Sequence, residues 1–216
     1  MCDAVEVRLV LALAVLSGCD LVLGLEKKTE GEDSERPAFC DLALFDDFET
    51  NGLACVWGVT FEEGVSQHDS VLEVRLTGTR PVFAGCTAFR GYALTERGVF
   101  LKISSPLRVD TAYTALGVRG MTQGTSSFKL AFDGSTDFYV NNVLKGSRDG
   151  EPLPWWRIRH EGANVIAEVS ADAMTWETIA NEPTAIPPSV AIDIGAGINA
   201  ASSPGSATFD TFGICN

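Results

Sequence analysis

Histidine, tyrosine and methionine are scarce in this sequence of 216 residues, and positive charge falls well behind negative charge. There are two His, three Tyr and three Met, and 16 Lys and Arg stand against 29 Asp and Glu, for a net charge of −13. So negative a chain repels nucleic acid, and no DNA or RNA partner is expected. With two His and neither a His-Glu-x-x-His nor a Cys-x-x-Cys motif, the sequence also lacks the pattern of a zinc site.

The apolar run near the start of the chain is short. It covers residues 9–16, reads LVLALAVL, and is followed by Ser17, Gly18 and Cys19. This length is too short for a transmembrane helix and is typical of the core of a secretory signal peptide. A buried helix is the alternative, but the run lacks the polar face that such a helix shows at a 3.6-residue period.

Residues 16–19, Leu-Ser-Gly-Cys, resemble the lipobox of bacterial lipoproteins. The resemblance implies cleavage before Cys19, attachment of a diacylglycerol to its thiol, and a domain anchored by lipid to a bacterial envelope membrane, outside the cytoplasm. The residues ahead of the apolar run carry more acidic than basic side chains, whereas a signal peptide begins with positive charge. We therefore expect translation to start at Val7, which a GTG codon allows.

Three regions follow along the chain: a signal peptide over 1–18, a flexible tether over 19–38 and one folded domain over 39–216. Residues 26–37, EKKTEGEDSERP, are mostly charged, include no large apolar side chain and end in Pro, which predicts a solvated tether.

After residue 39, apolar and polar residues alternate, and no amphipathic helical pattern appears. The alternation is clearest in segments separated by turns rich in Gly, Asp and Asn: 72–76, 99–103, 128–132, 165–169 and 190–194. A period of two indicates half-buried strands. Many short strands between such turns predict an all-β antiparallel sandwich or barrel.

Residues 155–180, WWRIRHEGANVIAEVSADAMTWETIA, resemble the concanavalin A-like jelly rolls of the laminin-G and DUF1349-like kind, as do FDDFE at 45–49 and ATFDTF at 207–212. The resemblance implies a two-sheet antiparallel jelly-roll sandwich whose first and last strands lie side by side. It covers both ends of the domain and its C-terminal half, whereas 55–150 shows strand periodicity alone. Because this fold carries lectins, glycosidases and adhesion modules alike, it does not determine function.

Four cysteines remain once the signal peptide and Cys19 are set aside: Cys40, Cys55, Cys86 and Cys215. An even number outside the cytoplasm predicts two disulfides, and four cysteines allow three pairings. The adjacent first and last strands that the resemblance implies favour Cys40 with Cys215, which leaves Cys55 with Cys86.

A glycosidase is the enzyme to consider, because one glycosidase group on this jelly roll carries a Glu-x-Asp-x-Glu strand. Retaining glycosidases need two carboxylates about 5 Å apart, and no such triplet occurs in the sequence. The strand expected at 190–194 holds a single acid, Asp193. We therefore predict a protein that is not an enzyme.

Aromatic residues offer the best candidates for a ligand site, because a pyranose presents apolar C–H faces and hydroxyls together. In an expected strand, Trp155 and Trp156 point to opposite faces. If Trp156 faces the core, Trp155 faces solvent beside Arg157 and Arg159, which forms a platform for a glycan or an acidic polymer. The alternative is that Trp155 covers a sheet edge or packs under a loop. Further candidates are Tyr113 and Tyr139.

Calcium is the one metal that the sequence favours. Oxygen ligands crowd one hairpin region at Asp133, Asp137 and Asn141, and relatives of the resembled fold often hold calcium in loops. The spacing matches no EF-hand, and acidic turns commonly bind nothing.

These observations predict an exported, lipid-anchored β-sandwich that acts as a non-catalytic module binding carbohydrate or another envelope polymer. The alternatives are a structural lipoprotein that meets an envelope protein and, third, an unrecognised glycoside hydrolase.

Overall fold

The described residues of the computed structural model form β-strands connected by turns. They cover 42–49, 64–76, 81–86, 91–94, 96, 98–109, 111–122, 124–198 and 204–215. All of them belong to one compact unit of the chain, Pro37–Asn216. The signal peptide, the tether, Cys19, Cys40 and Cys55 lie outside the described residues and stay predictions.

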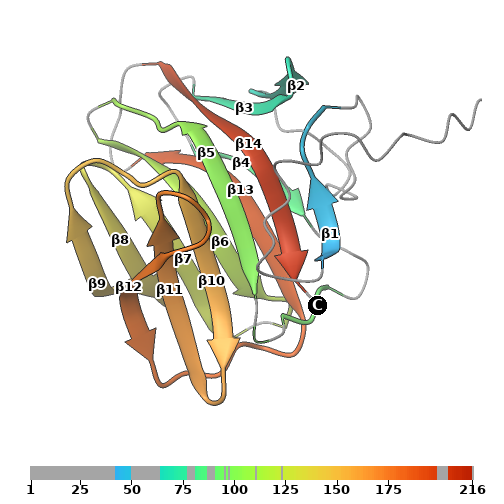
Figure 1. Cartoon of the computed structure of the whole chain (residues 1–216), viewed down its shortest axis with the longest axis vertical. Helices are drawn as coiled ribbons and strands as arrows, with labels where there is room; N and C mark the ends of the chain where they lie inside the picture. Colours follow the sequence, from blue (N-terminus) through green and yellow to red (C-terminus); the bar gives the residue numbers. More distant parts are fainter. Residues whose placement is uncertain are drawn as a thin grey trace, which may run out of the picture. The chain divides into compact units, whose positions relative to one another are not determined.

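The strands form two antiparallel sheets, which we call sheet A and sheet B (Figure 1). In spatial order, eight-stranded sheet A contains β12 (Trp176–Glu182), β11 (Asn164–Ser170), β10 (Trp155–Glu161), β5 (Val99–Ser105), β14 (Gly205–Cys215), β3 (Val71–Leu76) and β2 (Val65–His68), with β1 (Leu42–Asp46) also paired to β14. Six-stranded sheet B contains β4 (Val82–Cys86), β13 (Val190–Ile198), β6 (Ala112–Gly120), β7 (Ser127–Phe132), β8 (Ser135–Val140) and β9 (Val143–Asp149). The predicted two-sheet sandwich is therefore confirmed.

Each segment whose alternation predicted a strand lies in one: β3, β5, β7, β11 or β13. The pairing that the resemblance implied is also present, because β1 runs antiparallel to β14 with Phe45 opposite Gly213 and Asp46 opposite Phe212. Strands at opposite ends of the folded domain's sequence thus become neighbours in sheet A.

Turn residues of the expected kind connect the strands. Asn141 and Asn142 join β8 to β9 with φ angles of 51° and 63°. A two-residue hairpin turn with both φ angles positive matches the right-handed twist of the strands, and Asn tolerates that conformation. The side-chain Oδ1 of Asn141 accepts a hydrogen bond from the Ser127 N–H at 2.9 Å, so this turn is also tied to β7.

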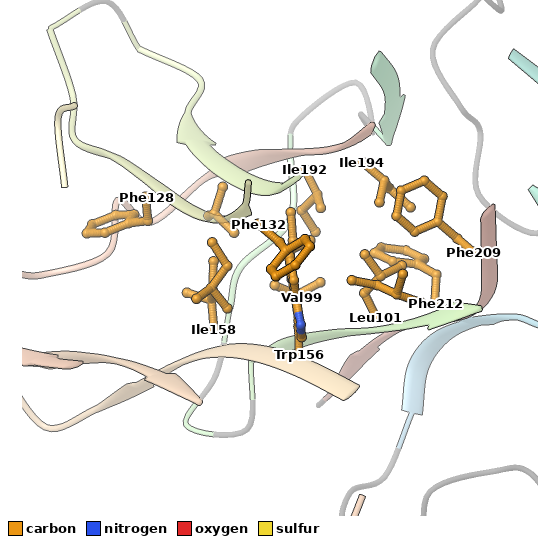
Figure 2. Close-up of a cluster of buried hydrophobic side chains, with 14 of the residues drawn as sticks. Val99, Leu101, Phe128, Phe132, Trp156, Ile158, Ile192, Ile194, Phe209 and Phe212 are labelled. Carbon is orange, nitrogen blue, oxygen red and sulfur yellow. The ribbon is translucent and has the colours of Figure 1, made fainter. Parts of the chain in front are cut away.

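The core fills the space between the two sheets. Figure 2 shows Val99, Leu101, Trp156 and Ile158 pointing from sheet A toward Phe128, Phe132, Ile192 and Ile194 of sheet B. All of these side chains are buried in one cluster, and Trp156 has no exposed surface. The opposite face of each strand is left for solvent or for a covering segment.

Ion pairs link the two sheets along one side. Edge strands β9 and β12 are in contact, and Arg148 Nε lies 3.0 Å from Glu177 Oε2 while Lys145 Nζ lies 2.9 Å from Glu182 Oε2. Charged side chains on edge strands also discourage pairing with another chain.

Cys215 ends β14 as a buried, disulfide-bonded cysteine. Its predicted partner, Cys40, lies outside the described residues, so the pairing stays a prediction, as does that of Cys55 with Cys86. Within the described ranges, no helix has the length and apolarity needed to cross a membrane.

Candidate functional site

The candidate site lies on the outward face of sheet B, where aromatic, charged and small side chains lie together. Inward positions of β6, β7, β8 and β13 hold core residues such as Leu116, Leu130, Phe138 and Ile192. Because side chains alternate along a strand, the positions between them point away from the core. We call the surface they form the sheet B face. Its residues are Phe83, Tyr113, Ala115, Gly117, Arg119, Ser127, Lys129, Ala131, Asp137, Tyr139, Asp193, Gly195 and Gly197.

Small residues in the middle of the sheet B face leave a hollow. The register places Asp193, Gly117, Lys129 and Tyr139 in one row across four strands. The next row is Gly195, Ala115, Ala131 and Asp137. Where these rows lack large side chains, a hollow of about 280 Å³ opens, lined by Phe83, Ala115, Gly117, Arg119, Ser127, Lys129 and Asp193 among others.

Aromatic rings lie against this face where glycine makes room for them. The ring of Tyr113 covers Gly197, where an added Cβ would collide with it. At Gly195 an added Cβ would meet the Val82 carbonyl first and then the Cα and ring of Phe83. The glycines therefore let the Tyr113 ring and the β4 backbone approach the sheet closely.

Lys129 lies between two tyrosines. Its Nζ is 4.5 Å from the ring centre of Tyr113 and 4.8 Å from that of Tyr139, which is the geometry of a cation–π contact. Burial lowers the pKa of Lys129, and the charge of Asp133 partly opposes that change. The pKa of Tyr139 is raised to about 12, first by burial and then by its hydrogen bond to Asp137. Both tyrosines are thus neutral at physiological pH.

The carboxylates of the face are held by neighbours. Asp137 accepts hydrogen bonds from the hydroxyls of Ser135 (2.9 Å), Ser147 (2.6 Å) and Tyr139 (3.0 Å). Asp193 pairs with Arg119 through Nε at 2.7 Å and Nη2 at 3.4 Å. This hydrogen bonding raises the pKa of Arg119, so its guanidinium stays charged throughout the physiological range.

Two of the predicted ligand residues, Tyr113 and Tyr139, are brought together here, but the other three are not. Trp155, Arg157 and Arg159 lie on the outward face of sheet A. Trp155 does point away from Trp156 as predicted, yet it is only 8% exposed, because it packs with Phe100, Ala173 and Cys215, and partly buried Trp176, Leu42 and Phe45 lie against that cluster. The prediction of a solvent-facing tryptophan is therefore wrong.

The two arginines beside Trp155 form ion pairs within the domain. Arg157 Nη2 lies 2.7 Å and Arg159 Nε 2.9 Å from the same Glu168 oxygen, and Glu168 is only 4% exposed. The Arg157 guanidinium also stacks on the ring of Trp176 at 4.0 Å. This face is thus a packed cluster with an internal ion-pair network, and it offers no open platform.

The predicted calcium ligands are not gathered into one site. Asp133 precedes β8 and Asn141 follows it, so the two lie at opposite ends of that strand. Asp137, in between, already accepts three hydroxyl donors, and the amide oxygen of Asn141 is bonded to Ser127. Within the part of the chain that the structure describes, no group of three or more His, Cys, Asp or Glu side chains could hold a metal ion.

Sequence reasoning missed Phe83, Arg119 and Lys129, and it treated Asp193 as an isolated acid. The available signal was weak: Ser127, Lys129 and Ala131 alternate with buried residues of β7, which makes them outward-facing. Only the cross-strand register shows that Lys129, Asp193 and the tyrosines share one face.

Solved structures share this fold. LamAcat from Zobellia galactanivorans superimposes with a TM-score of 0.57 at 10% identity, covering 83% of this chain and 99% of that one. SCLam, a non-specific endo-β-1,3(4)-glucanase of family GH16, gives 0.55 at 8% identity, with 83% and 96% covered. A β-glucanase of Bacillus licheniformis gives 0.51 at 12% identity, with 80% and 97% covered. No family model and no curated protein matches the chain. The domain has the concanavalin A-like jelly-roll fold.

These structures contradict the prediction that the protein is not an enzyme. SCLam and the Bacillus licheniformis protein are glucanases built on the same sandwich. Absence of the Glu-x-Asp-x-Glu triplet excludes one arrangement of carboxylates, but acids contributed by a turn or by neighbouring strands are not visible as a sequence motif. At identities this low the likeness establishes the fold, and activity has to be argued from the site.

Proposed function

We propose that this protein binds a saccharide chain across the sheet B face. The observation that carries the proposal is the hollow of about 280 Å³, lined by Phe83, Arg119 and Lys129 among others, with two tyrosine rings against the ammonium of Lys129. Sugar rings stack their C–H faces on aromatic surfaces and direct their hydroxyls to polar groups. Phe83, Tyr113 and Tyr139 offer the first kind of contact, and Arg119, Asp137 and Asp193 the second. The glucanase folds of the structural neighbours support a carbohydrate ligand.

Tyr113→Ala and Tyr139→Ala are expected to weaken retention on a polysaccharide about tenfold each, because an aromatic contact contributes roughly 1 kcal/mol beyond its buried area. Affinity electrophoresis of the protein against soluble β-glucans, xylans, mannans and galactans measures this. Tyr113→Phe and Tyr139→Phe are the matched controls: they keep the rings and should retain most of the affinity. Retention on none of these polymers, or retention that both alanine variants leave unchanged, contradicts the proposal.

Hydrolysis of the bound saccharide is a second candidate function, favoured by the placement of two acids. Asp137 lies opposite Ala131 in the β7–β8 hairpin, and Asp133 lies in the turn just after β7. The charge of Asp133 acts on Lys129 and Tyr139, which places it near the same group of side chains. Glycosidases use carboxylate pairs separated by roughly 5 to 9.5 Å. Asp133, which is exposed, and Asp137, which is half-buried and hydrogen-bonded, thus occupy distinct environments.

Release of reducing ends from a retained polysaccharide tests hydrolysis. Asp133→Asn and Asp137→Asn should each abolish the release, because each variant removes one of the two carboxylates that hydrolysis requires. Asp149→Asn, an exposed acid on the neighbouring edge strand, is the control and should leave the release unchanged. Release that survives both Asp133 and Asp137 substitutions rules out this pair as the catalytic acids.

We further propose that a lipid at Cys19 anchors the protein to an envelope membrane, where the sheet B face would meet extracellular or periplasmic glycans. The apolar run and the lipobox-like residues 16–19 support this anchor. Mass spectrometry of the protein from a bacterial host is expected to show an N-terminus at Cys19 with added acyl mass. An N-terminus that still contains residues 9–18 would contradict the anchor.

A further inference from the structure

Lys129 differs from the other cations of the described domain. Each other Lys and Arg in the described ranges has a carboxylate within ion-pair distance, as in Arg119 with Asp193 and Lys145 with Glu182. No described carboxylate lies that close to Lys129. In a chain with 29 acids and 16 basic residues, a half-buried cation without an ion pair is unexpected.

The surroundings of Lys129 explain how this cation is tolerated. The faces of Tyr113 and Tyr139, 4.5 and 4.8 Å away, partly offset its loss of hydration. The acids in its own row and in the next one already have partners, Asp193 in Arg119 and Asp137 in three hydroxyls. The charge of Asp133 also acts on Lys129, from beyond ion-pair distance. Ring faces attract the charge but accept its N–H groups poorly, so the ammonium keeps hydrogen-bonding capacity toward the hollow.

The charged residues that line the hollow also single out Lys129. Arg119 and Asp193 both line it and neutralise one another, which leaves Lys129 as the uncompensated charge among its lining residues. Among the residues that line the hollow, Lys129 is therefore the one net positive charge, at a half-buried position. Asp133 and Asp137 lie outside this lining. Charge-assisted hydrogen bonds from an ammonium are about twice as strong as neutral ones.

We propose that Lys129 binds an anionic substituent, a carboxylate or a sulfate, on the saccharide held by the sheet B face. This inference rests on the proposed saccharide binding and specifies the ligand class as an acidic saccharide. The net charge of −13 opposes a densely charged polymer at long range, whereas contact with one anionic group is governed by the local positive charge of Lys129. A sparsely charged saccharide fits both conditions.

The test compares matched polysaccharides that differ in their anionic groups. Glucuronoxylan against arabinoxylan tests for a carboxylate, and a sulfated galactan against agarose tests for a sulfate. Affinity electrophoresis of the full protein is expected to show about tenfold tighter binding to the anionic member of one pair. Lys129→Met should reduce that affinity to the level of the neutral member, and Lys129→Arg should preserve the preference.

Lys145→Met is the matched control, because Lys145 lies on edge strand β9 and pairs with Glu182 outside the hollow. It should keep the preference for the anionic polymer, and unchanged thermal unfolding of Lys129→Met excludes a general loss of fold. Equal binding of both members of each pair, or a preference that Lys129→Met retains, overturns the inference while saccharide binding stands. Binding of none of the four polymers overturns the proposed function as well.

Discussion

Replacing Trp156 with alanine is expected to lower the free energy of unfolding by about 4 kcal/mol, within the range seen when large aromatic core residues are truncated. Trp156 is fully buried, lies opposite Leu101 and Val169 in sheet A, and points into the space between the sheets (Figure 2). Its indole Nε1 also donates a hydrogen bond to the Leu153 carbonyl at 3.0 Å. The variant would thus leave a cavity and remove the hydrogen bond to that carbonyl.

Equilibrium urea unfolding under oxidising conditions measures this change. For a domain of this size, the same loss corresponds to a decrease in Tm of roughly 10 °C. Met174→Ala is the control: its side chain is 85% exposed, and the expected change is within about 0.5 kcal/mol. A loss below about 1.5 kcal/mol for Trp156→Ala would show that the core rearranges to fill the space.

Replacing Glu168 with alanine is expected to destabilise the domain by about 3 kcal/mol, because it leaves two partly buried guanidinium groups without their shared carboxylate. Arg157 and Arg159 both contact Glu168, and burial already lowers the pKa of Arg157. The arginine side chains retain 12% and 21% exposure, which lets solvent relieve part of the penalty and places the effect at the lower end of the usual range.

Glu161→Ala is a close control, since Glu161 pairs with the same Arg159 at 2.6 Å but is 60% exposed. An exposed ion pair contributes at most about 1 kcal/mol and is screened by salt. Urea unfolding of the two variants side by side should separate them by about 2 kcal/mol or more. Equal losses would mean that burial of Glu168 does not determine the strength of this network.

The two outward faces of the sandwich have different roles because different segments lie on them. On sheet A, Trp155 packs with Phe100 and Cys215. Arg157 and Arg159 form ion pairs with Glu168 on the same face. On sheet B, glycine and alanine leave a hollow at the centre, and the ring of Tyr113 lies over Gly197. Open space, aromatic surface and an unpaired cation therefore meet on sheet B, which is why we place the ligand there.

Much of the candidate site could not be predicted from the sequence. Tyr113 and Tyr139 could be singled out as aromatic residues in strands, but their shared contact with Lys129 depends on the pairing of β6, β7 and β8. Asp193 enters the same row from β13, far along the chain. A single strand shows which of its residues share a face, and it does not show which strands stand beside it.

The sequence by itself determined which side chains of each strand face the core, because burial of alternate apolar residues leaves one arrangement that removes them from water. The same alternation also determined the all-β antiparallel class, a sandwich or a barrel, and the opposite orientations of Trp155 and Trp156. Only the tertiary structure decided which outward face stays open. Trp155 is covered by residues from other strands and loops, whereas Lys129 faces a hollow because Gly117, opposite it on β6, has no side chain. The residues that cover Trp155, and Asp193 and Gly195 of β13 beside the hollow, come from distant parts of the chain, and no local pattern encodes their contact.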